Sequence, residues 1–310
     1  MGFDRLTSIE AITAGLDTVG YISTPDISTA VFLAQHLRKP ILIEGPAGVG
    51  KTDLAKSTAA FLELPLVRLQ CYEGLDEGKA LYEWKYGKQL LYTQVLKEKL
   101  HHILDGAESL AASFEKLHGF DDLFFSEAFL EPRPLLQALR QEHGAVLLID
   151  EVDKADEEFE AFLLEVLSDY QVTVPELGTV SALVPPLVML TSNNTREIGD
   201  ALKRRCLHLH IGFPEAGREA RIVRARVPDI SEALLKRLVA FVQTLRAEDI
   251  RKLPSIAETV DWARTLLILH AESLDADLVR RTLNVLLKFE NDIRLVEPKL
   301  EKILRKAAEG

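Results

Sequence analysis

The amino-acid sequence predicts an α/β domain built on a parallel sheet, followed by a domain made of helices. Up to about residue 213, short apolar runs suited to buried strands alternate with helical patterns, which is typical of parallel sheets. After Gly212-Phe213-Pro214 the strand pattern stops, and residues 215–308 show helical patterns only. We therefore expect one domain over residues 1–213 and a second over residues 214–310.

Helical patterns open the first domain and recur between its strands. Residues 7–37 predict two helices, and the second begins at Thr24-Pro25-Asp26, where a capping residue precedes a proline. Further helices are expected after residue 50 and over residues 155–167. Two short runs, 172–174 and 180–184, flank Gly178 and predict a hairpin. Five apolar runs are the candidates for the parallel strands: 41–43, 66–69, 145–149, 187–190 and 207–211.

Residues 72–140 interrupt this alternation, and we interpret them as an insertion on the sheet. Helical periodicity returns within the insertion between residues 95 and 117. Near its start lies a cluster of aromatic and basic side chains: Tyr82, Trp84, Lys85, Tyr86, Lys88 and Tyr92.

The composition favours a protein whose partners are not polyanions. The chain of 310 residues is 47% apolar and 27% charged, which is ordinary for a globular protein. Its 37 Lys and Arg against 48 Asp and Glu give a net charge of −11. Because an acidic surface repels phosphate backbones, nucleic acid is an unexpected main partner.

Three features predict a cytoplasmic location without a membrane span. The chain lacks a run of about 18 apolar residues. Its N-terminus, MGFDRLTSIE, lacks the basic-then-apolar order of a signal peptide. The two cysteines, Cys71 and Cys206, show neither metal-binding nor redox spacing, so we expect ordinary thiols in a reducing compartment.

A glycine-rich segment between the first strand and the next helix predicts a phosphate-binding loop. The segment fits G-x-x-x-x-G-K-[ST] and runs through Gly45, Pro46, Ala47, Gly48, Val49, Gly50, Lys51 and Thr52, with Asp53 next. Backbone N–H groups of such a loop and the following helix N-terminus bind anionic oxygens. Lys51 would reach the outer phosphates, and the Thr52 hydroxyl would bind Mg²⁺. The alternative is a glycine-rich turn with a chance lysine.

Two carboxylates, Asp150 and Glu151, follow the most apolar strand of the chain. Asp150 suits a Mg²⁺ ligand, directly or through water, because carboxylate oxygens are among the ligands Mg²⁺ prefers. Glu151 suits a general base that polarises a water for attack on a γ-phosphate. The alternative is that the pair only caps the helix that follows.

Two further polar segments border apolar strands. Thr191-Ser192-Asn193-Asn194 lies at a strand end, where an asparagine can orient a water, although asparagine also favours turns. Lys203-Arg204-Arg205-Cys206 precedes the last strand, where an arginine can stabilise phosphoryl-transfer charge or form a solvated basic turn.

The order of these four sites resembles that of AAA+ ATPases. "GPAGVGKT" resembles Walker A, "VLLIDE" Walker B, "LTSNN" sensor 1 and "LKRRC" the arginine-finger segment. More narrowly, "LIEGPAGVGKT" and "LLIDEVDKADEEFEAFLLEVLSDYQVTV", with the hairpin before sensor 1, resemble the MoxR family. The resemblance covers residues 15–213 well and the helical remainder loosely.

The resemblance implies a P-loop NTPase with a five-stranded parallel sheet, a helical lid and ring assembly, usually as a hexamer. ATP and Mg²⁺ would bind between subunits, with the glycine loop on the phosphates. It implies the following further roles: Thr52 and Asp150 at Mg²⁺, Glu151 as base, Asn193 rather than Asn194 as sensor 1, Arg205 or else Arg204 as the finger, and Gly20-Tyr21-Ile22 at adenine.

The lid departs from the MoxR pattern. MoxR lids often carry a sensor 2 arginine after a Ser-Pro pair, whereas "RKLPSIAETVDWAR" places Glu258 near that position. Arg251, Lys252 and Arg264 are the candidates to replace it, and the sequence leaves sensor 2 unassigned. The segment "ALYEWKYGKQLLYTQ" is placed like the helix-2 insertion of MoxR proteins, which faces the ring axis or client. Its aromatic cluster either serves that purpose or packs the insertion.

The resemblance favours an ATP-driven chaperone that remodels or activates a partner, with a von Willebrand A domain protein as co-factor. The segment "EGLDEGKALYEWKYGKQLLYTQ" is most similar to ATPases near the carbon monoxide dehydrogenase accessory proteins, so the client is expected to be a metalloenzyme under maturation. The alternatives are a nucleic-acid-acting AAA+ motor, a nucleotide-regulated scaffold with little turnover, and a small-molecule kinase.

Overall fold

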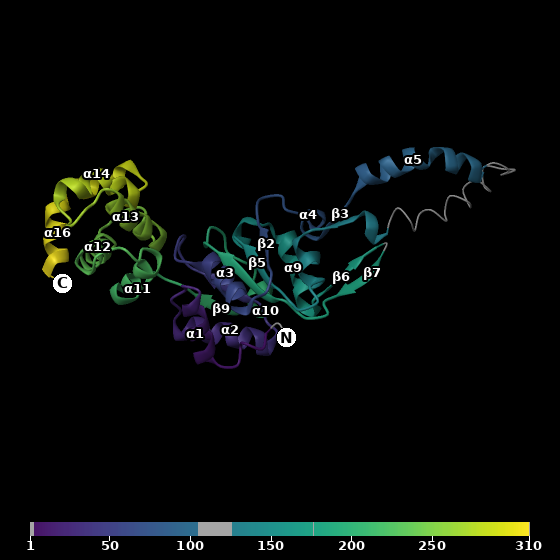
Figure 1. The fold of residues 1–310 in the computed structure, drawn as a ribbon, viewed down its shortest axis with the longest axis horizontal. Helices are drawn as coiled ribbons and strands as arrows, with labels where there is room; N and C mark the ends of the chain where they lie inside the picture. The colour runs from purple at the N-terminus through teal and green to yellow at the C-terminus, as the bar shows by residue number, and fades with distance from the viewer. Residues whose placement is uncertain (1–2, 105–125, 176, 310) are drawn as a thin grey trace.

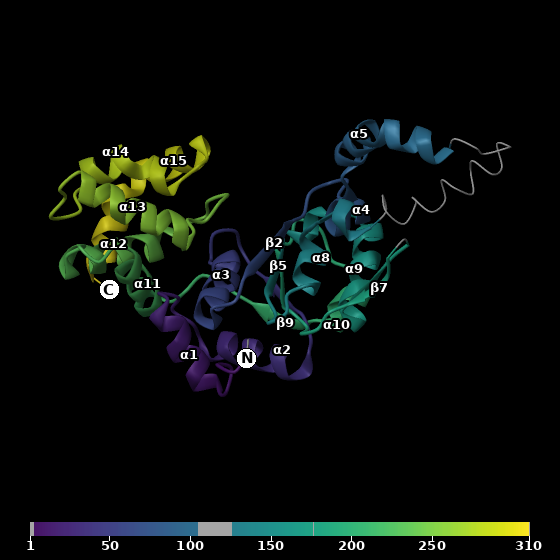
Figure 2. The ribbon, with the colours of Figure 1, turned by 45° about the vertical axis from the view of Figure 1, so that its right-hand side comes forward.

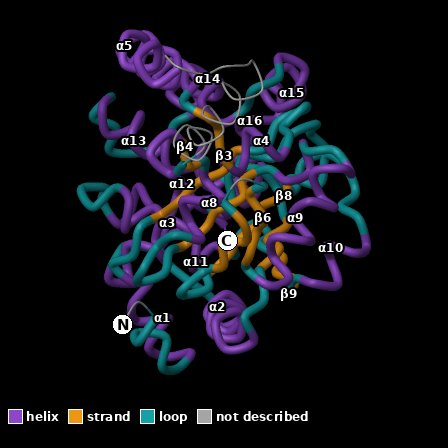
Figure 3. The backbone as a smooth tube through the Cα atoms, turned by 90° about the vertical axis from the view of Figure 1, so that its right-hand side faces the viewer, coloured by secondary structure: helices purple, strands orange, loops and turns teal. Residues whose placement is uncertain are grey.

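A five-stranded parallel sheet forms the centre of the protein. The computed structural model describes residues 3–104, 126–175 and 177–309. The strand order is β2-β5-β8-β1-β9, and helices surround the strands (Figures 1 and 3). The strands are β1 (Ile41–Glu44), β2 (Leu66–Gln70), β5 (Val146–Asp150), β8 (Leu187–Ser192) and β9 (Leu207–His210). The predicted α/β class and the five strand candidates are confirmed.

The register of the sheet brings the predicted polar segments to one edge. Leu42 of β1 pairs with Leu190 of β8, and Ile149 of β5 pairs with the same residue. The strands are parallel, so their carboxyl ends, where Glu44, Asp150 and Ser192 lie, meet at the same edge. Ligands of open α/β sheets bind at this edge.

Different helices cover the two faces of the sheet, because alternate residues of a strand point to opposite sides. Ile43 and Leu148 belong to an apolar core shared with α1, α2 and α3, whereas Leu42 and Leu147 belong to a core with α8, α9 and α10. The helices are α1 (Ile9–Thr18), α2 (Pro25–Leu37), α3 (Lys51–Leu62), α8 (Pro134–Leu139), α9 (Glu157–Asp169) and α10 (Asp200–Arg205).

Local signals place several helix ends. Thr24 caps α2 by accepting a hydrogen bond from Ile27 N, with Pro25 at the first position, as predicted. The helix predicted over residues 155–167 begins two residues later, because Asp156 is its cap and accepts from Phe159 N at 2.9 Å. A short 3-10 helix, η2 (Val152–Lys154), precedes it.

The predicted hairpin consists of β6 (Gln171–Val174) and β7 (Gly178–Ser181), which pair antiparallel. Gly178 has a φ of 80°, which suits glycine in the turn. The second strand was predicted to reach Val184, but pairing ends at Ser181, four residues before Pro185-Pro186. Glu176, in the predicted turn, lies outside the described residues.

The insertion forms a small base and a projecting helix. Besides α8, which packs against the sheet, its described elements are α4 (Glu77–Leu81), β3 (Tyr82–Trp84), α5 (Tyr86–Leu104), η1 (Glu127–Phe129) and β4 (Leu130–Pro132), with β3 and β4 antiparallel. Figure 1 shows α5 extending away from the sheet domain. The part of the helical pattern beyond residue 104 lies outside the described residues.

The aromatic cluster of the insertion is divided between packing and solvent. Trp84 is buried and meets Tyr82 edge-on, with ring centroids 5.8 Å apart. Tyr92 meets Phe129 in the same way at 5.3 Å. Tyr86, by contrast, is 64% exposed. Tyr92 is itself 45% exposed, so packing accounts for Tyr82 and Trp84, whereas α5 keeps an exposed apolar side.

The described residues after His210 form helices only. The helical domain contains α11 (Ala216–Arg226), α12 (Glu232–Leu245), α13 (Ile256–Ile268), α14 (Ala276–Leu286), α15 (Glu290–Val296), η3 (Glu297–Lys299) and α16 (Leu300–Glu309). They gather beside α1 and α3, at the end opposite α5 (Figure 2). The domain boundary near Pro214 stays a prediction, and it falls where strands give way to helices.

Two other sequence expectations concern thiols and membranes. Cys71 and Cys206 are free thiols, and burial raises the pKa of each to about 12, which keeps them protonated and unreactive. Among the described helices, none combines the length and the apolar character of a membrane-spanning segment.

A buried ion pair joins three helices of the helical domain. Arg246, at the end of α12, contacts Glu219 of α11 at 2.6 Å, and their side chains are 7% and 0% exposed. Glu219 also accepts from Gln243 and from Thr259 of α13. Because a buried charge is costly without its partner, each member of this network depends on the others.

We expect Arg246→Ala to lower the free energy of unfolding by about 3–5 kcal/mol, because it leaves the Glu219 carboxylate buried and unpaired. Urea unfolding followed by circular dichroism measures this loss. The control is Arg280→Ala, whose pair with Asp277 is largely exposed and worth about 1 kcal/mol or less. Equal losses in the two variants would contradict the assigned role of the buried network.

Candidate functional site

The glycine-rich loop between β1 and α3 has the backbone that its sequence demands. Gly45, Gly48 and Gly50 have φ values of 147°, 76° and 100°, which other residues rarely adopt. A Cβ at Gly45 would lie 2.0 Å from the carbonyl oxygen of Ile211. The glycines therefore allow both the turn and the close packing of the loop.

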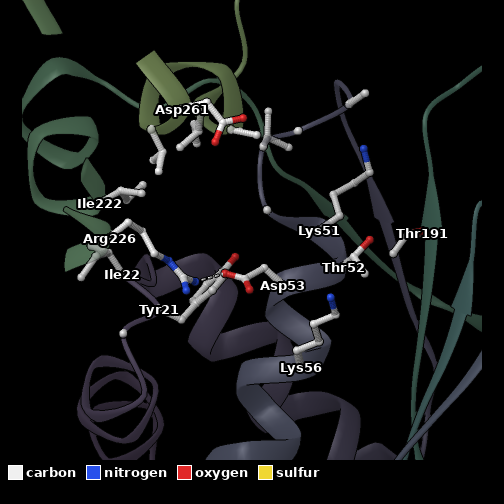
Figure 4. Close-up of a pocket in the computed structure, with 18 of the residues that line it drawn as sticks. Tyr21, Ile22, Lys51, Thr52, Asp53, Lys56, Thr191, Ile222, Arg226 and Asp261 are labelled. Atoms are coloured by element: carbon white, nitrogen blue, oxygen red, sulfur yellow. Dashed lines mark hydrogen bonds and ion pairs between the residues drawn. The ribbon is translucent and has the colours of Figure 1, made fainter. Parts of the chain in front are cut away.

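A cavity of about 470 Å³ opens beside this loop, between the sheet domain and the helical domain. Figure 4 shows Lys51, Thr52 and Asp53 on one side and Ile222, Arg226 and Asp261 of the helical domain on the other. Among the other lining residues are Gly20, Tyr21, Ile22, Asp150, Glu151, Thr191 and Asn193. Residues far apart in the sequence thus share one cavity of the size of a small-molecule site.

Lys51 is the buried cation of the cavity, with 6% of its surface exposed. Its Nζ donates to the carbonyl oxygens of Gly45 (2.6 Å) and Pro46 (2.8 Å) and to Asn193 Oδ1 (2.8 Å). Burial lowers the pKa of Lys51, and the nearby carboxylates Asp153, Asp150 and Glu151 oppose that shift. The amine is therefore held within the loop, where it can meet an anion.

The carboxylate of Asp150 is buried and fully engaged. Oδ1 accepts from Thr52 Oγ1 (3.0 Å) and from the hydroxyl of Thr191. Oδ2 accepts from Nε and Nη2 of Arg68, at 3.1 and 2.6 Å. Arg68 was not among the predicted site residues. It lies two positions before Gln70, the residue of β2 that pairs with Asp150, and on the same side of the strand.

Thr52 and Asp150 fit a Mg²⁺ ion shared with phosphates. Both offer oxygen donors, which Mg²⁺ prefers, and they lie in hydrogen-bond contact beside the phosphate-loop candidate. Within the described residues, no group of three or more His, Cys, Asp or Glu side chains could hold a metal ion by itself. Mg²⁺ usually takes one or two protein ligands together with waters and substrate phosphates.

Glu151 lies at the cavity rim in a left-handed conformation, with a φ of 58°. Its N–H donates to Thr191 Oγ1 at 2.9 Å. Its carboxylate accepts from Lys154 Nζ (2.6 Å), Gln70 Nε2 (2.9 Å) and Asn193 Nδ2 (3.3 Å). These carboxylates do not cap α9, because Asp156 is that cap. Glu151 occupies the N-cap position of η2, but its side chain makes no capping hydrogen bond there.

The structure distinguishes the two asparagines after β8. Asn193 joins Lys51 to Glu151 through its amide, whereas Asn194 has a φ of 57° and bonds to Ser192 Oγ within the turn. Asp153, which sequence analysis missed, holds this turn: its Oδ2 accepts from Asn193 N (3.3 Å) and from Thr195 N (2.9 Å). Burial pushes the pKa of Asp153 up, but the hydrogen bonds from the Thr195 hydroxyl, Thr195 N and Asn193 N outweigh burial and bring the pKa below its usual value.

The helical domain contributes three arginines to the cavity. Arg264, one of the three sensor 2 candidates, lines it, whereas Arg251 stacks on Phe289 and Lys252 pairs with Glu258. Glu258 itself closes the capping box of α13 with Ser255.

Arg218 and Arg226 of α11 line the same cavity, and sequence analysis missed both. Arg218 donates to the carbonyl oxygen of Ile22 at 3.0 Å, and Arg226 pairs with Asp53. The sequence feature that could have indicated both residues is the arginine-rich run "REARIVRAR", which begins shortly after the predicted domain boundary near Pro214.

Comparison with known proteins decides the family. Residues 40–206 match the family described as AAA domain (dynein-related subfamily), which is more than half of the chain. The chain belongs to this family. The match spans the glycine loop, the paired carboxylates, Asn193 and the arginine segment, so these features are parts of one AAA domain.

Similar proteins extend the comparison beyond the AAA domain. An uncharacterized protein of Staphylococcus epidermidis is 25% identical over 218 residues, which is 68% of this chain and 70% of that protein. An uncharacterized protein of Staphylococcus aureus is 25% identical over 238 residues, or 74% and 76%. A solved structure of a Thermotoga maritima RuvB mutant has a TM-score of 0.50 at 15% identity, covering 96% of this chain and 78% of that one. That likeness shows a shared AAA+ fold.

The arginine-finger candidates of the AAA domain lie apart from the cavity. Arg204 and Arg205 are exposed on α10, and neither lines the cavity. Arg205 donates to Ser168 Oγ of α9. The structure therefore does not bring them to Lys51 within one subunit, and their role stays a prediction about a neighbouring subunit.

The predicted adenine segment lines the cavity on the side of α11. Tyr21 is buried, which raises its pKa, and its Oη has no hydrogen-bond partner within the described residues. The ring lies beside Gly50 of the loop, where an added Cβ would be 3.8 Å from Tyr21 Cε2. Tyr21 and Ile22 are thus placed for a base next to the phosphate loop, and their role stays a prediction.

Lys51→Ala is expected to weaken ATP binding by about ten- to hundredfold, because charge-assisted hydrogen bonds to the outer phosphates are lost. Isothermal titration calorimetry measures the affinity. Lys56→Ala is the matched control, since Lys56 lines the same cavity from the same helix but is exposed. An unchanged affinity for Lys51→Ala would rule out the phosphate loop.

Proposed function

We propose that this AAA protein binds Mg²⁺ and ATP in the cavity between its two domains and hydrolyses ATP. The observation that carries the proposal is the convergence of Lys51, Thr52, Asp150, Glu151 and Asn193 on one rim of that cavity. Two separate sets of direct hydrogen bonds run from the loop to the carboxylates: Lys51 reaches Glu151 through Asn193, and Thr52 reaches Asp150. Phosphoryl transfer relies on positioning and charge stabilisation, and these are the groups that provide them.

Each side chain then has a specific task. Lys51 and the loop N–H groups hold the outer phosphates, and Thr52 and Asp150 hold Mg²⁺, which neutralises phosphate charge when bound. Glu151 accepts the proton of the attacking water. Asn193, which contacts both Lys51 and Glu151, keeps that water between the phosphate and the base.

We propose further that the active form is a ring, and we expect a hexamer, in which Arg205 of one subunit completes the site of the next. The support is the placement of Arg205 on the exposed surface of α10, away from its own cavity. An arginine supplied in this way stabilises the charge of the transferred phosphoryl group. Arg204 is the second candidate for this role.

We propose a MoxR-type chaperone as the biological role, acting with a von Willebrand A domain protein on a client that is a metalloenzyme. The support is the motif pattern, together with the shape of the sheet domain. Both α5 and the β6–β7 hairpin project from the end opposite the helical domain (Figures 1 and 2). The exposed side chains Tyr86, Leu90 and Leu91 give α5 an apolar surface for a protein partner.

A nucleotide-regulated scaffold is the second candidate, and one observation favours it. Glu151 is already paired with Lys154 and Gln70, so its carboxylate must be released before it can act as a base. If release were rare, the protein would bind ATP and seldom hydrolyse it. A nucleic-acid motor has less support, because the net charge is −11.

Glu151→Gln should leave ATP affinity intact and slow hydrolysis by about 10²–10⁴, because the amide keeps the shape and loses the base. A coupled phosphate-release assay gives the rate. Glu157→Gln, an exposed change on α9, is the control and should hydrolyse at the wild-type rate. Wild-type turnover too slow to detect would instead favour the scaffold.

Arg205→Ala should bind ATP normally and hydrolyse it about 10³–10⁵ more slowly, because the finger acts on the neighbouring subunit's phosphate. Mixing Arg205→Ala with Lys51→Ala should restore part of the activity, since some interfaces then pair an intact finger with an intact loop. Arg294→Ala, in an exposed pair on α15, is the control. Rates strictly proportional to protein concentration, without rescue on mixing, would exclude the shared site.

A further inference from the structure

Arg68 contacts Asp150, the proposed Mg²⁺ ligand, whose carboxylate would be expected to face only Mg²⁺ and water. Arg68 belongs to β2, an edge strand of the sheet, and its side chain is 47% exposed. Its guanidinium reaches the buried Asp150 carboxylate through two nitrogens, Nε at 3.1 Å and Nη2 at 2.6 Å from Oδ2. A half-exposed cation therefore covers the outer oxygen of the proposed Mg²⁺ ligand.

The carboxylate has a physical need for this partner. The Asp150 side chain is 4% exposed, and a buried carboxylate is costly without a counter-charge. Thr52 and Thr191 are neutral donors, and Lys51 Nζ bonds to carbonyl oxygens and to Asn193 instead. Within the described residues, Arg68 is the cation that forms an ion pair with Asp150.

We propose that Arg68 is a resident cation of the metal site: it neutralises Asp150 when Mg²⁺ is absent and leaves the carboxylate when Mg²⁺ and nucleotide bind. This inference rests on the proposed nucleotide site. A guanidinium and a divalent ion on one carboxylate repel each other at short range. Asp150 is held by Thr52 and Thr191, whereas Arg68 is long and half exposed, so Arg68 is the group that moves.

The movement of Arg68 also affects the proposed base, Glu151, because Gln70 lies between them. Arg68 Nη2 also donates to Gln70 Oε1 at 2.6 Å, and Gln70 Nε2 donates to Glu151 Oε2 at 2.9 Å. Arg68 and Gln70 share one side of β2, because they are two positions apart. When Arg68 leaves Asp150, it also leaves Gln70, and the hold of Gln70 on Glu151 loosens. Arg68 is thus a positioning residue that links metal occupancy to the freedom of the base.

The test measures the Mg²⁺ requirement of nucleotide binding rather than turnover. Fluorescently labelled ADP is bound to the full chain across a Mg²⁺ titration and, separately, in EDTA. In Arg68→Gln the half-saturating Mg²⁺ concentration should fall about fivefold, the effect of removing one half-exposed ion pair that competes for Asp150. ADP affinity in EDTA should change by less than about twofold, because Arg68 does not hold the phosphates.

Two further variants make the result specific. Arg68→Lys keeps a charge beside Asp150 and should stay near the wild-type Mg²⁺ requirement. Arg133→Gln removes an arginine of similar exposure, which pairs with Glu83 in the insertion, and should match wild type. Thermal unfolding confirms that each variant is folded.

The contrary outcomes separate this inference from the proposed function. An unchanged Mg²⁺ requirement in Arg68→Gln, with ADP bound normally, would overturn the role of Arg68 and leave the nucleotide site standing. Weaker ADP binding both with Mg²⁺ and in EDTA would show that Arg68 contacts phosphate, which also overturns it. Wild-type protein that binds no ADP under either condition would refute the nucleotide site and this inference together.

Discussion

The carboxylate of Asp150 ties together the segments on which the site depends. It is buried at the end of β5, and it receives hydrogen bonds from Thr52 of α3, Thr191 of β8 and Arg68 of β2. A charge taken out of water must be matched by donors at fixed positions, so each of these segments is held in register with the others. The loop, the candidate sensor and the edge strand consequently respond to the same group, and a ligand that changes the bonds of Asp150 affects all of them.

Residues of the sheet domain and of the helical domain both line the cavity, so a nucleotide bound there, as proposed, would contact both. Arg218 and Arg226 of α11 bond to Ile22 and Asp53 of the sheet domain, and Ala257 N of α13 donates to Gly48 O of the loop at 3.3 Å. These contacts join residues that line the cavity from its two sides, and the ion pair between Arg226 and Asp53 is partly exposed. Exchanging such contacts for contacts with phosphate or base costs little, so occupancy of the cavity can change how the helical domain sits on the loop.

The glycine loop also contacts the helical domain through uncharged groups. A Cβ at Gly48 would lie 2.4 Å from Ser255 Oγ, at the start of α13. Ser255 caps that helix, and Glu258 completes the capping box. Glu258, the lid residue considered in place of a sensor 2 arginine, therefore serves to begin α13. The cavity is lined on the side of the helical domain by the cations Arg218, Arg226 and Arg264.

The sequence by itself determined the fold class, the five strands and the placement of the loop and the paired carboxylates. Those signals are local: apolar runs of strand length, glycines that turn the backbone, and polar residues directly after a strand. It did not find Arg68, Gln70 or Asp153, because nothing near them in the chain marks them as parts of the site. Their roles arise from β2 pairing with β5 and from the turn after β8 folding over η2. Nor could the sequence show which arginines of the helical domain line the cavity, because that depends on how the two domains pack against each other. Parallel strands bring distant residues to one edge, and only the tertiary structure shows which side chains then share a carboxylate.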